Sequence, residues 1–224
     1  MPRYFKLLRE GLIHNGFTYK PGLNVLSEPF NEAPVCGPGG LYFSEEKDIF
    51  QWLDWLYDDD IEWIAEVELC PDSRVVYLDK QCKTDKFILG PIYSLKEFIN
   101  NPANTKMAVQ NCCATLCYVE DQRSDICLAA IQQDGTAIQY VREQTPELCL
   151  AAVQQNGWAL IYVKDQNQNQ NPEICLAAVQ QTWYALQFVK DQTAEMCLTA
   201  YAQNKAATQY FKYRTDNELN HIIY

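Results

Sequence analysis

Three near-copies of one nonapeptide stand in the second half of this chain: Cys127-Leu-Ala-Ala-Ile-Gln-Gln-Asp-Gly135, Cys149-Leu-Ala-Ala-Val-Gln-Gln-Asn-Gly157 and the shorter Cys175-Leu-Ala-Ala-Val-Gln-Gln181. A fourth copy at residues 197–204 is degenerate, and an earlier one aligns at residues 105–111 with Thr105 in the cysteine position. Self-similarity at a spacing of about 22 residues is the signature of a repeat architecture. We therefore expect about five structural units in this half.

Each unit is expected to begin with an α-helix. Thr145-Pro146-Glu147 and Asn171-Pro172-Glu173 each supply an N-cap residue, a proline at the first helical position and an acid in the first turn. The equivalent segment Arg123-Ser124-Asp125 fits this scheme only if the N-cap position is shifted by one residue. After the cap, one face of the helix carries Leu148, Cys149, Ala152 and Val153, and Asn156-Gly157 ends it.

A second helix is expected to follow in each unit, with its buried stripe formed by Ala159, Leu160, Tyr162 and Val163. A helix pair this short cannot bury its stripe alone, so neighbouring pairs must stack into a short α-solenoid. The polar run 166–171 is expected to be a loop extension between units. The tail 217–224 has enough apolar residues to cap the exposed end of the stack.

Residues 1–100 lack this period and alternate short β-type runs with turns. We expect strands at residues 4–8, 40–43, 63–69, 74–78 and 86–89. One helix is expected to start at an N-cap Ser44, to bury Ile49, Phe50, Leu53, Leu56 and Tyr57, and to end at residues 58–60. The fold class is therefore an α+β head domain at 1–100, followed by an all-α domain of stacked two-helix repeats at 101–224.

Composition excludes several classes of function. The chain has 18 Lys plus Arg against 29 Asp plus Glu, so its net charge is −11, and no basic cluster favours nucleic acid or anionic lipid. No apolar run is long enough to span a membrane, and residues 1–6 lack a signal-peptide core, so an intracellular protein is expected. Ten cysteines accompany only two histidines, His14 and His221. We therefore expect buried thiols rather than a zinc site, and no cofactor.

Two resemblances follow from these residues. The pattern Pro-Glu-x-Cys-Leu-Ala-Ala-Val-x-Gln-Asn-Gly-x-Ala-Leu-x-Tyr-Val, over about residues 101–214, resembles a repeat family of unknown function abundant in large DNA viruses of amoebae. The first half resembles a lead module of giant-virus repeat proteins through residues 15–19, 39–43 and 85–90. The first resemblance implies a viral or amoeba-associated origin and nothing about catalysis, and the second suggests an adaptor. We therefore expect a non-catalytic protein-interaction or adaptor module whose partner is a host or viral protein, in the host cytoplasm or in the virus particle.

An enzyme is the alternative. Residues 40–44 followed by a helix look like the centre of the ADP-ribosyltransferase fold, and this resemblance implies catalytic roles for Ser44, Glu66 and Glu68. Strand alternation places Glu66 and Glu68 on one face, which is also what a solvated strand shows. A structural component of a virus particle is a third possibility.

Partner-binding candidates are the large residues at positions that repeat packing leaves variable. Trp158 and Tyr184 occupy the position that holds Thr136 in another unit, and Ile161 occupies that of Gln139. Aromatic side chains on a shared face favour protein recognition, although the two rings are equally compatible with packing against each other or against the head domain. Trp52 and Trp55, on one side of the first helix, are further candidates.

Overall fold

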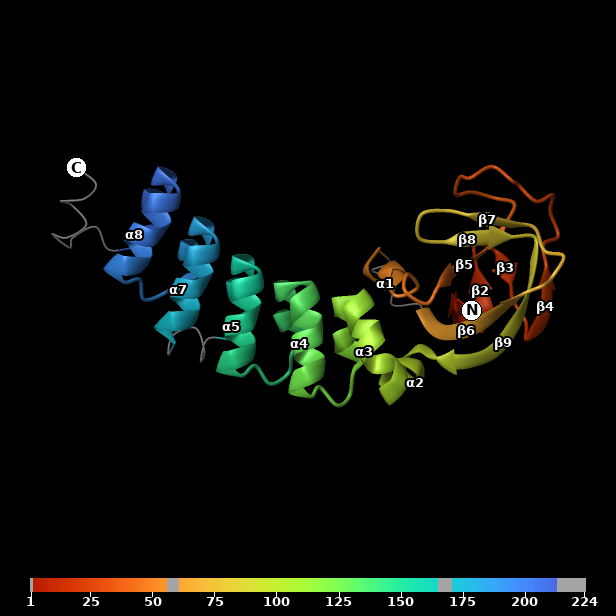
Figure 1. Cartoon of the computed structure of the whole chain (residues 1–224), viewed down its shortest axis with the longest axis horizontal. Coiled ribbons are helices and arrows are strands. Elements are labelled where there is room, and N and C mark those ends of the chain that lie inside the picture. The colour runs from red at the N-terminus through yellow and green to blue at the C-terminus, as the bar shows by residue number, and fades with distance from the viewer. Residues whose placement is uncertain (1, 56–60, 165–170, 213–224) are drawn as a thin grey trace. The chain divides into compact units, whose positions relative to one another are not determined.

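The computed structural model describes residues 2–55, 61–164 and 171–212, which divide into two units, Met1–Glu120 and Asp121–Tyr224 (Figure 1). The first unit contains the sheet and the first helical pair, and the second contains the later pairs. This division groups the first pair with the sheet, whereas the sequence-based boundary after residue 100 groups it with the later repeats. The predicted fold class is confirmed: a sheet-rich region precedes stacked two-helix repeats.

The first unit is built on an antiparallel sheet of seven strands in the order β4-β9-β6-β1-β5-β8-β7. The five predicted strands are present, and β9 is longer than expected because it continues past Gly90. The bounds are β1 Tyr4–Arg9, β4 Gly22–Val25, β5 Leu41–Glu45, β6 Ile61–Leu69, β7 Val75–Tyr77, β8 Cys82–Thr84 and β9 Lys86–Ser94. A short 3₁₀ helix, η1 Glu10–Leu12, leads into a small hairpin of β2 Ile13–His14 and β3 Phe17–Thr18.

The seven-stranded sheet curls back on itself. A single residue, Asp85, joins β8 to β9, although β5, β1 and β6 separate these two strands in the sheet order. The backbone nitrogen of Leu26, just after β4, donates to the carbonyl of the same Asp85 at 2.8 Å. The interior of the curl is filled by apolar side chains that include Leu8, Tyr19, Leu41, Phe43, Val67, Phe87 and Leu89.

The central strand β1 is buried on both faces. Leu8 points into the curled sheet, while the ring of Phe5 lies 5.4 Å from that of Phe98 in helix α2 Leu95–Asn100. A strand covered on both sides reads as a continuous apolar run rather than as an alternating one, which is what residues 4–8 show. The exception in that run is Lys6, which is buried as well.

The first predicted helix begins later than expected. Strand β5 runs through Ser44 to Glu45, and the helix α1 spans only Gln51–Trp55, so the prediction of Ser44 as its N-cap is wrong. The Ser44 hydroxyl instead accepts a hydrogen bond from Nε1 of Trp52 at 3.0 Å. Phe50 is buried as predicted, whereas Leu56, Tyr57 and residues 58–60 lie outside the described residues.

The helical pairs share one pattern, a ten-residue α-helix followed by a six-residue 3₁₀ helix. In the second unit the α-helices α4, α5, α7 and α8 lie side by side (Figure 1). The bounds are α3 Pro102–Asn111 with η2 Cys113–Tyr118, α4 Ser124–Gln133 with η3 Gly135–Tyr140, α5 Pro146–Gln155 with η4 Gly157–Tyr162, α7 Pro172–Gln181 with η5 Trp183–Phe188, and α8 Ala194–Gln203 with η6 Lys205–Tyr210.

The helix starts follow the predicted capping chemistry. The hydroxyl of Thr145 accepts from the backbone nitrogen of Leu148, and the side chain of Asn171 accepts from that of Glu173. Arg123 occupies the N-cap position of α4 without a side-chain hydrogen bond, as the irregular sequence there implies. The tail 217–224 and most of the run 166–171 lie outside the described part of the chain.

The second helix of each pair is a 3₁₀ helix, which corrects the predicted buried stripe. A 3₁₀ helix repeats every three residues, so Leu160 and Val163 share one ridge, and both are buried. Tyr162, which α-helical spacing placed in the buried stripe, is 40% exposed. On the α-helices the predicted face is confirmed, because Cys149, Ala152 and Val153 are fully buried.

The repeat cysteines pack as small apolar residues. Cys127, Cys149, Cys175 and Cys197 are all buried, as predicted. Burial raises the pKa of the Cys175 thiol to about 11, so this thiol stays protonated at neutral pH. No disulfide bond joins any of the ten cysteines, all of which lie within the described ranges.

Gly157 is required by the closeness of the next unit. A Cβ atom placed there would lie 2.7 Å from the carbonyl oxygen of Ala178 and 2.7 Å from Cγ2 of Thr182. We therefore expect Gly157→Ala to lower the free energy of unfolding by about 1–3 kcal/mol, because backbone atoms must shift. Lys205 fills the same position in the last pair and is exposed, so Lys205→Ala is the matched control. Equal melting temperatures for the two variants would show that the units are not tightly stacked at Gly157.

Candidate functional site

An exposed ridge runs along the 3₁₀ helices of the second unit. Because residues three apart eclipse in a 3₁₀ helix, Trp158 and Ile161 of η4 project side by side, and they are 45% and 51% exposed. Neighbouring 3₁₀ helices contact one another, so the ridges of η3, η4 and η5 lie together. We call this surface the 3₁₀ face, formed by Thr136, Gln139, Trp158, Ile161, Tyr184 and Gln187.

Five rings gather beside this ridge. The ring centroids of Trp158 and Tyr184 are 4.8 Å apart, and that of Trp158 lies 5.9 Å from that of Phe188. Tyr184 stands nearly perpendicular to Tyr210 at 5.2 Å, and a hydrogen bond between the two side chains raises the pKa of Tyr210. Trp183 contacts both tyrosines. The rings thus fix one another in place, while Trp158 keeps nearly half of its surface exposed.

A glutamine bridge that sequence reasoning missed links the 3₁₀ helix of one pair to the end of the 3₁₀ helix of the next pair. Gln144, before α5, is 8% exposed, and its Nε2 donates to the carbonyls of Ile138 and Tyr162 at 3.0 Å each. Its Oε1 accepts from the backbone nitrogen of Lys164 at 2.9 Å. One side chain therefore satisfies three backbone groups, in the preceding 3₁₀ helix and at the end of its own.

The same bridge recurs in other pairs. Nε2 of Gln192 donates to the carbonyls of Leu186 and Tyr210, and its Oε1 accepts from Lys212. Gln122 makes the equivalent bonds to Tyr140 and Arg142. The sequence signal was available, since each bridging glutamine follows an acid and stands five residues before the repeat cysteine.

The residues of the ADP-ribosyltransferase resemblance lie on the two strands that flank β1 in the sheet, but Ser44 and Glu66 each have another contact. Phe5 pairs with Ser44 on one side and with Glu66 on the other, so Ser44 and Glu66 stand in one row across β1. Ser44 is buried, and Glu66 lies 3.3 Å from a guanidinium nitrogen of Arg3. Glu68 is exposed and pairs across the sheet with Ile88.

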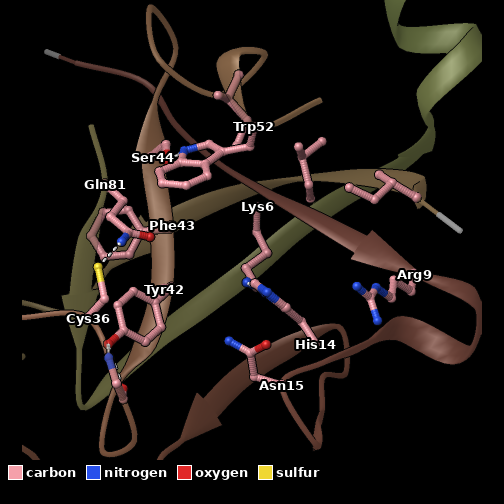
Figure 2. A pocket seen from close by; sticks show the side chains of 14 residues that line it. Lys6, Arg9, His14, Asn15, Cys36, Tyr42, Phe43, Ser44, Trp52 and Gln81 are labelled. Atoms are coloured by element: carbon pink, nitrogen blue, oxygen red, sulfur yellow. Dashed lines mark hydrogen bonds between the residues drawn. The ribbon is translucent and has the colours of Figure 1, made fainter. Parts of the chain in front are cut away.

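A cavity of about 340 Å³ opens in the first unit next to Lys6 (Figure 2). Its lining includes Trp52, which is half-buried there, and the hydroxyl-bearing Tyr42 and Ser44. Trp55 is the last described residue of α1, and its side chain lies outside the described part. Nζ of Lys6 and Nδ1 of His14 are in hydrogen-bond contact at one end of the cavity. Sequence reasoning missed this site, because the strand run 4–8 gave no sign that its lysine lines a cavity.

Burial sets the charge of both groups. It lowers the pKa of Lys6 to about 7, and burial together with nearby Lys6 and Arg9 lowers the pKa of His14 to about 3. His14 is therefore neutral at physiological pH, while Lys6 is divided between its ammonium and free-amine forms.

The lowered pKa of Lys6 makes stability depend on pH. Above pH 7 the unfolded chain holds a proton on this amine that the folded chain has largely released, so folding stability rises with pH. Between pH 7 and 8.5 we expect a gain of about 1 kcal/mol per pH unit in urea unfolding, because one proton is exchanged. Lys6→Met removes the titrating group, so the unfolding free energy of this variant should rise by about 1 kcal/mol less per pH unit than that of the wild type. Identical slopes for wild type and Lys6→Met would contradict the placement of Lys6 in an apolar interior.

No three side chains of His, Cys, Asp or Glu within residues 2–55, 61–164 and 171–212 are grouped so that they could hold a metal ion. None of the helices in those ranges is both long and apolar enough to cross a membrane.

The family model described as "Domain of unknown function (DUF4116)" matches residues 124–168 and, in overlap, residues 145–192. Three curated relatives come from Acanthamoeba polyphaga mimivirus. "Uncharacterized protein R869" is 52% identical over 100 residues, which cover 42% of this chain and 69% of the relative. "Putative ankyrin repeat protein R868" is 41% identical over 86 residues, covering 38% of this chain and 40% of the relative.

"Putative ankyrin repeat protein R896" is 46% identical over 50 residues, covering 22% of this chain and 15% of the relative. This chain thus spans less than half of the length of the two relatives named for ankyrin repeats. No solved structure matches it. Since the match to R869 covers more than two thirds of that relative at 52% identity, the chain belongs to the family of this amoebal giant-virus protein.

Proposed function

We propose that this chain is a viral protein-interaction module and that its 3₁₀ face holds a partner protein. One observation carries the proposal. Trp158 and Ile161 project from η4 at positions that Thr136 and Gln139 occupy in η3, so stacking of the repeats does not require large apolar side chains there. Exposed large side chains that packing does not demand are typical of binding surfaces.

The ring packing beside the ridge suits this role. Binding is weakened when side chains must be immobilised on association, and Trp158 is already held by Tyr184 and Phe188. The bridging glutamines further fix the 3₁₀ helices that carry the ridge. The surface is therefore preorganised before a partner arrives.

The relatives favour the same class of function. Two of them are named as putative ankyrin repeat proteins, and stacked repeats use one continuous face to bind their partners. The partner we propose is a host or viral protein, met in the host cytoplasm or in the virus particle. Nucleic acid is a poorer candidate, because the net charge of −11 opposes binding to a polyanion.

The catalytic alternative gains no support from the relatives, none of which is named for a transferase. The hydroxyl of Ser44 is buried and already engaged by Trp52, which leaves it poorly placed to receive a substrate. We therefore do not carry the transferase roles of Ser44, Glu66 and Glu68 into the proposal.

The proposal is tested by comparing proteins captured from amoebal lysate by the full chain and by Ile161→Asp. A charge at the exposed ridge should reduce capture of a partner held there by at least about tenfold, since an unpaired charge would be buried in the interface. A partner captured equally well by both baits would be bound at some other surface.

A further inference from the structure

Lys6 sits in an unusual place for a lysine. It lies in the middle of β1, between the buried Phe5 and Leu7, and only 2% of its surface is exposed. Its Nζ atom contacts Nδ1 of His14 and lies 5.0 Å from the ring centroid of Tyr19. Among the described residues no carboxylate comes within ion-pair distance of it. A buried ammonium without a counter-ion is costly, so this environment favours the free amine.

The cavity beside Lys6 has the size and lining of a small-molecule site. Its volume of about 340 Å³ lies within the range of ligand pockets. Of the residues in the described ranges that line it, none is Asp or Glu, although acids outnumber bases in the chain. Apolar side chains, among them Phe43, Ile49 and Trp52, form much of the wall. Tyr42 and Ser44 also line it, and their hydroxyls are already hydrogen-bonded to Gly37 and Trp52.

We propose that this cavity binds a small, largely apolar aldehyde or ketone and that Nζ of Lys6 forms an imine with it. A neutral amine adds to a carbonyl carbon, and its proton passes to the carbonyl oxygen to give a carbinolamine. The carbinolamine then loses its hydroxyl group together with the second proton of the nitrogen as water, and a carbon–nitrogen double bond forms, so no oxidant or reductant is consumed. His14, which is in contact with Nζ, orients the amine (Figure 2).

Its place at the cavity also distinguishes Lys6 from the other buried lysine of this unit. Lys83 is fully buried, but its Nζ donates to the carbonyl of Val35 at 3.0 Å, and Lys83 does not line the cavity. Lys47 represents the opposite case, since it is exposed and lies 3.2 Å from a carboxylate oxygen of Glu45. These two lysines are internal controls for burial and for exposure.

The experiment treats the full chain with benzaldehyde and sodium cyanoborohydride at pH 7, which reduces the imine to a stable secondary amine. Peptide mass spectrometry then gives the rate of labelling at each lysine. We expect Lys6 to be labelled at least about tenfold faster than Lys47, because far more of it is unprotonated at this pH, and Lys83 to remain unlabelled. In urea the chain unfolds and the cavity is lost, so Lys6 and Lys47 should then be labelled at similar rates.

Two further measurements test whether the cavity, and not only the unprotonated state of the amine, accounts for fast labelling at Lys6. Replacing benzaldehyde by the polar glyceraldehyde should reduce labelling at Lys6 but not at Lys47, since only the cavity favours an apolar probe. Lys6→Met should leave the buried Lys83 unlabelled, which checks that the variant is folded. If Lys6 is labelled no faster than Lys47, or resists labelling as Lys83 does, the proposal is wrong.

Discussion

Replacing Gln144 with glutamate should lower the free energy of unfolding by about 3 kcal/mol or more. The carboxylate can no longer donate to the carbonyls of Ile138 and Tyr162, and it places a negative charge against both oxygens in a buried site. For a chain of this length that loss corresponds to a fall of roughly 6–12 °C in melting temperature.

The matched control is Gln154→Glu, which makes the same change of charge on the exposed side of α5. A surface substitution of this kind changes stability by about 0.5 kcal/mol or less. Acidification should reverse much of the Gln144→Glu defect, because a protonated carboxyl regains one hydrogen-bond donor. If Gln144→Glu melted at the same temperature as Gln154→Glu, the glutamine bridge would not hold the pairs together.

The repeat was predictable because near-identical packing requirements recur along the chain. The cysteine, alanine and valine positions of each α-helix pack against equivalent neighbours in every unit, so the same residue types recur there from one unit to the next. The N-caps were equally visible, since Thr145 and Asn171 stand directly before prolines. The strands of the first unit were found where apolar runs are long, as at β1 and β6.

Several features were hidden for physical reasons. Six residues are too few to separate a 3₁₀ helix from an α-helix by periodicity, so Tyr162 was assigned to the wrong side. Ser44 followed by two acids has the composition of an N-cap, but pairing with Phe5 extends the strand through it. The strands β2, β3 and β4 are two to four residues long and form through pairing rather than through local preference.

The site was only partly visible from sequence. Comparing equivalent positions singled out Trp158, Tyr184 and Ile161, and these side chains now lie together on the 3₁₀ face. The three other rings of the cluster, Trp183, Phe188 and Tyr210, were not singled out as binding candidates, because contacts between successive pairs depend on how the units stack. The cavity at Lys6 required knowledge of the curled sheet, which no local pattern contains.

Removing the exposed ridge should abolish partner binding with a modest effect on stability. The double variant Trp158→Ala with Ile161→Ala deletes the two exposed side chains of η4 and keeps the buried Leu160 and Val163. We expect partner affinity to fall by about tenfold to a hundredfold or more, as at a hot spot. The stability loss should stay near 1–2 kcal/mol, which is the value of the ring contacts of Trp158.

The control is Leu23→Ala on the edge strand β4, where an exposed apolar side chain of similar accessibility lies outside the 3₁₀ face. Its partner affinity and its melting temperature should both match those of the wild type. This comparison separates a specific surface from a general loss of exposed apolar area.

The most direct measurement titrates one captured partner, once purified, against wild type, the double variant and Leu23→Ala by calorimetry, with a melting curve for each protein. The account predicts that the double variant loses binding while its melting temperature falls by roughly 2–8 °C and by less than that of Gln144→Glu, and that Leu23→Ala binds normally. Retained affinity in the double variant, or a melting temperature that falls as far as that of Gln144→Glu, would contradict the account, because the ridge would then be part of the core and the partner would bind elsewhere.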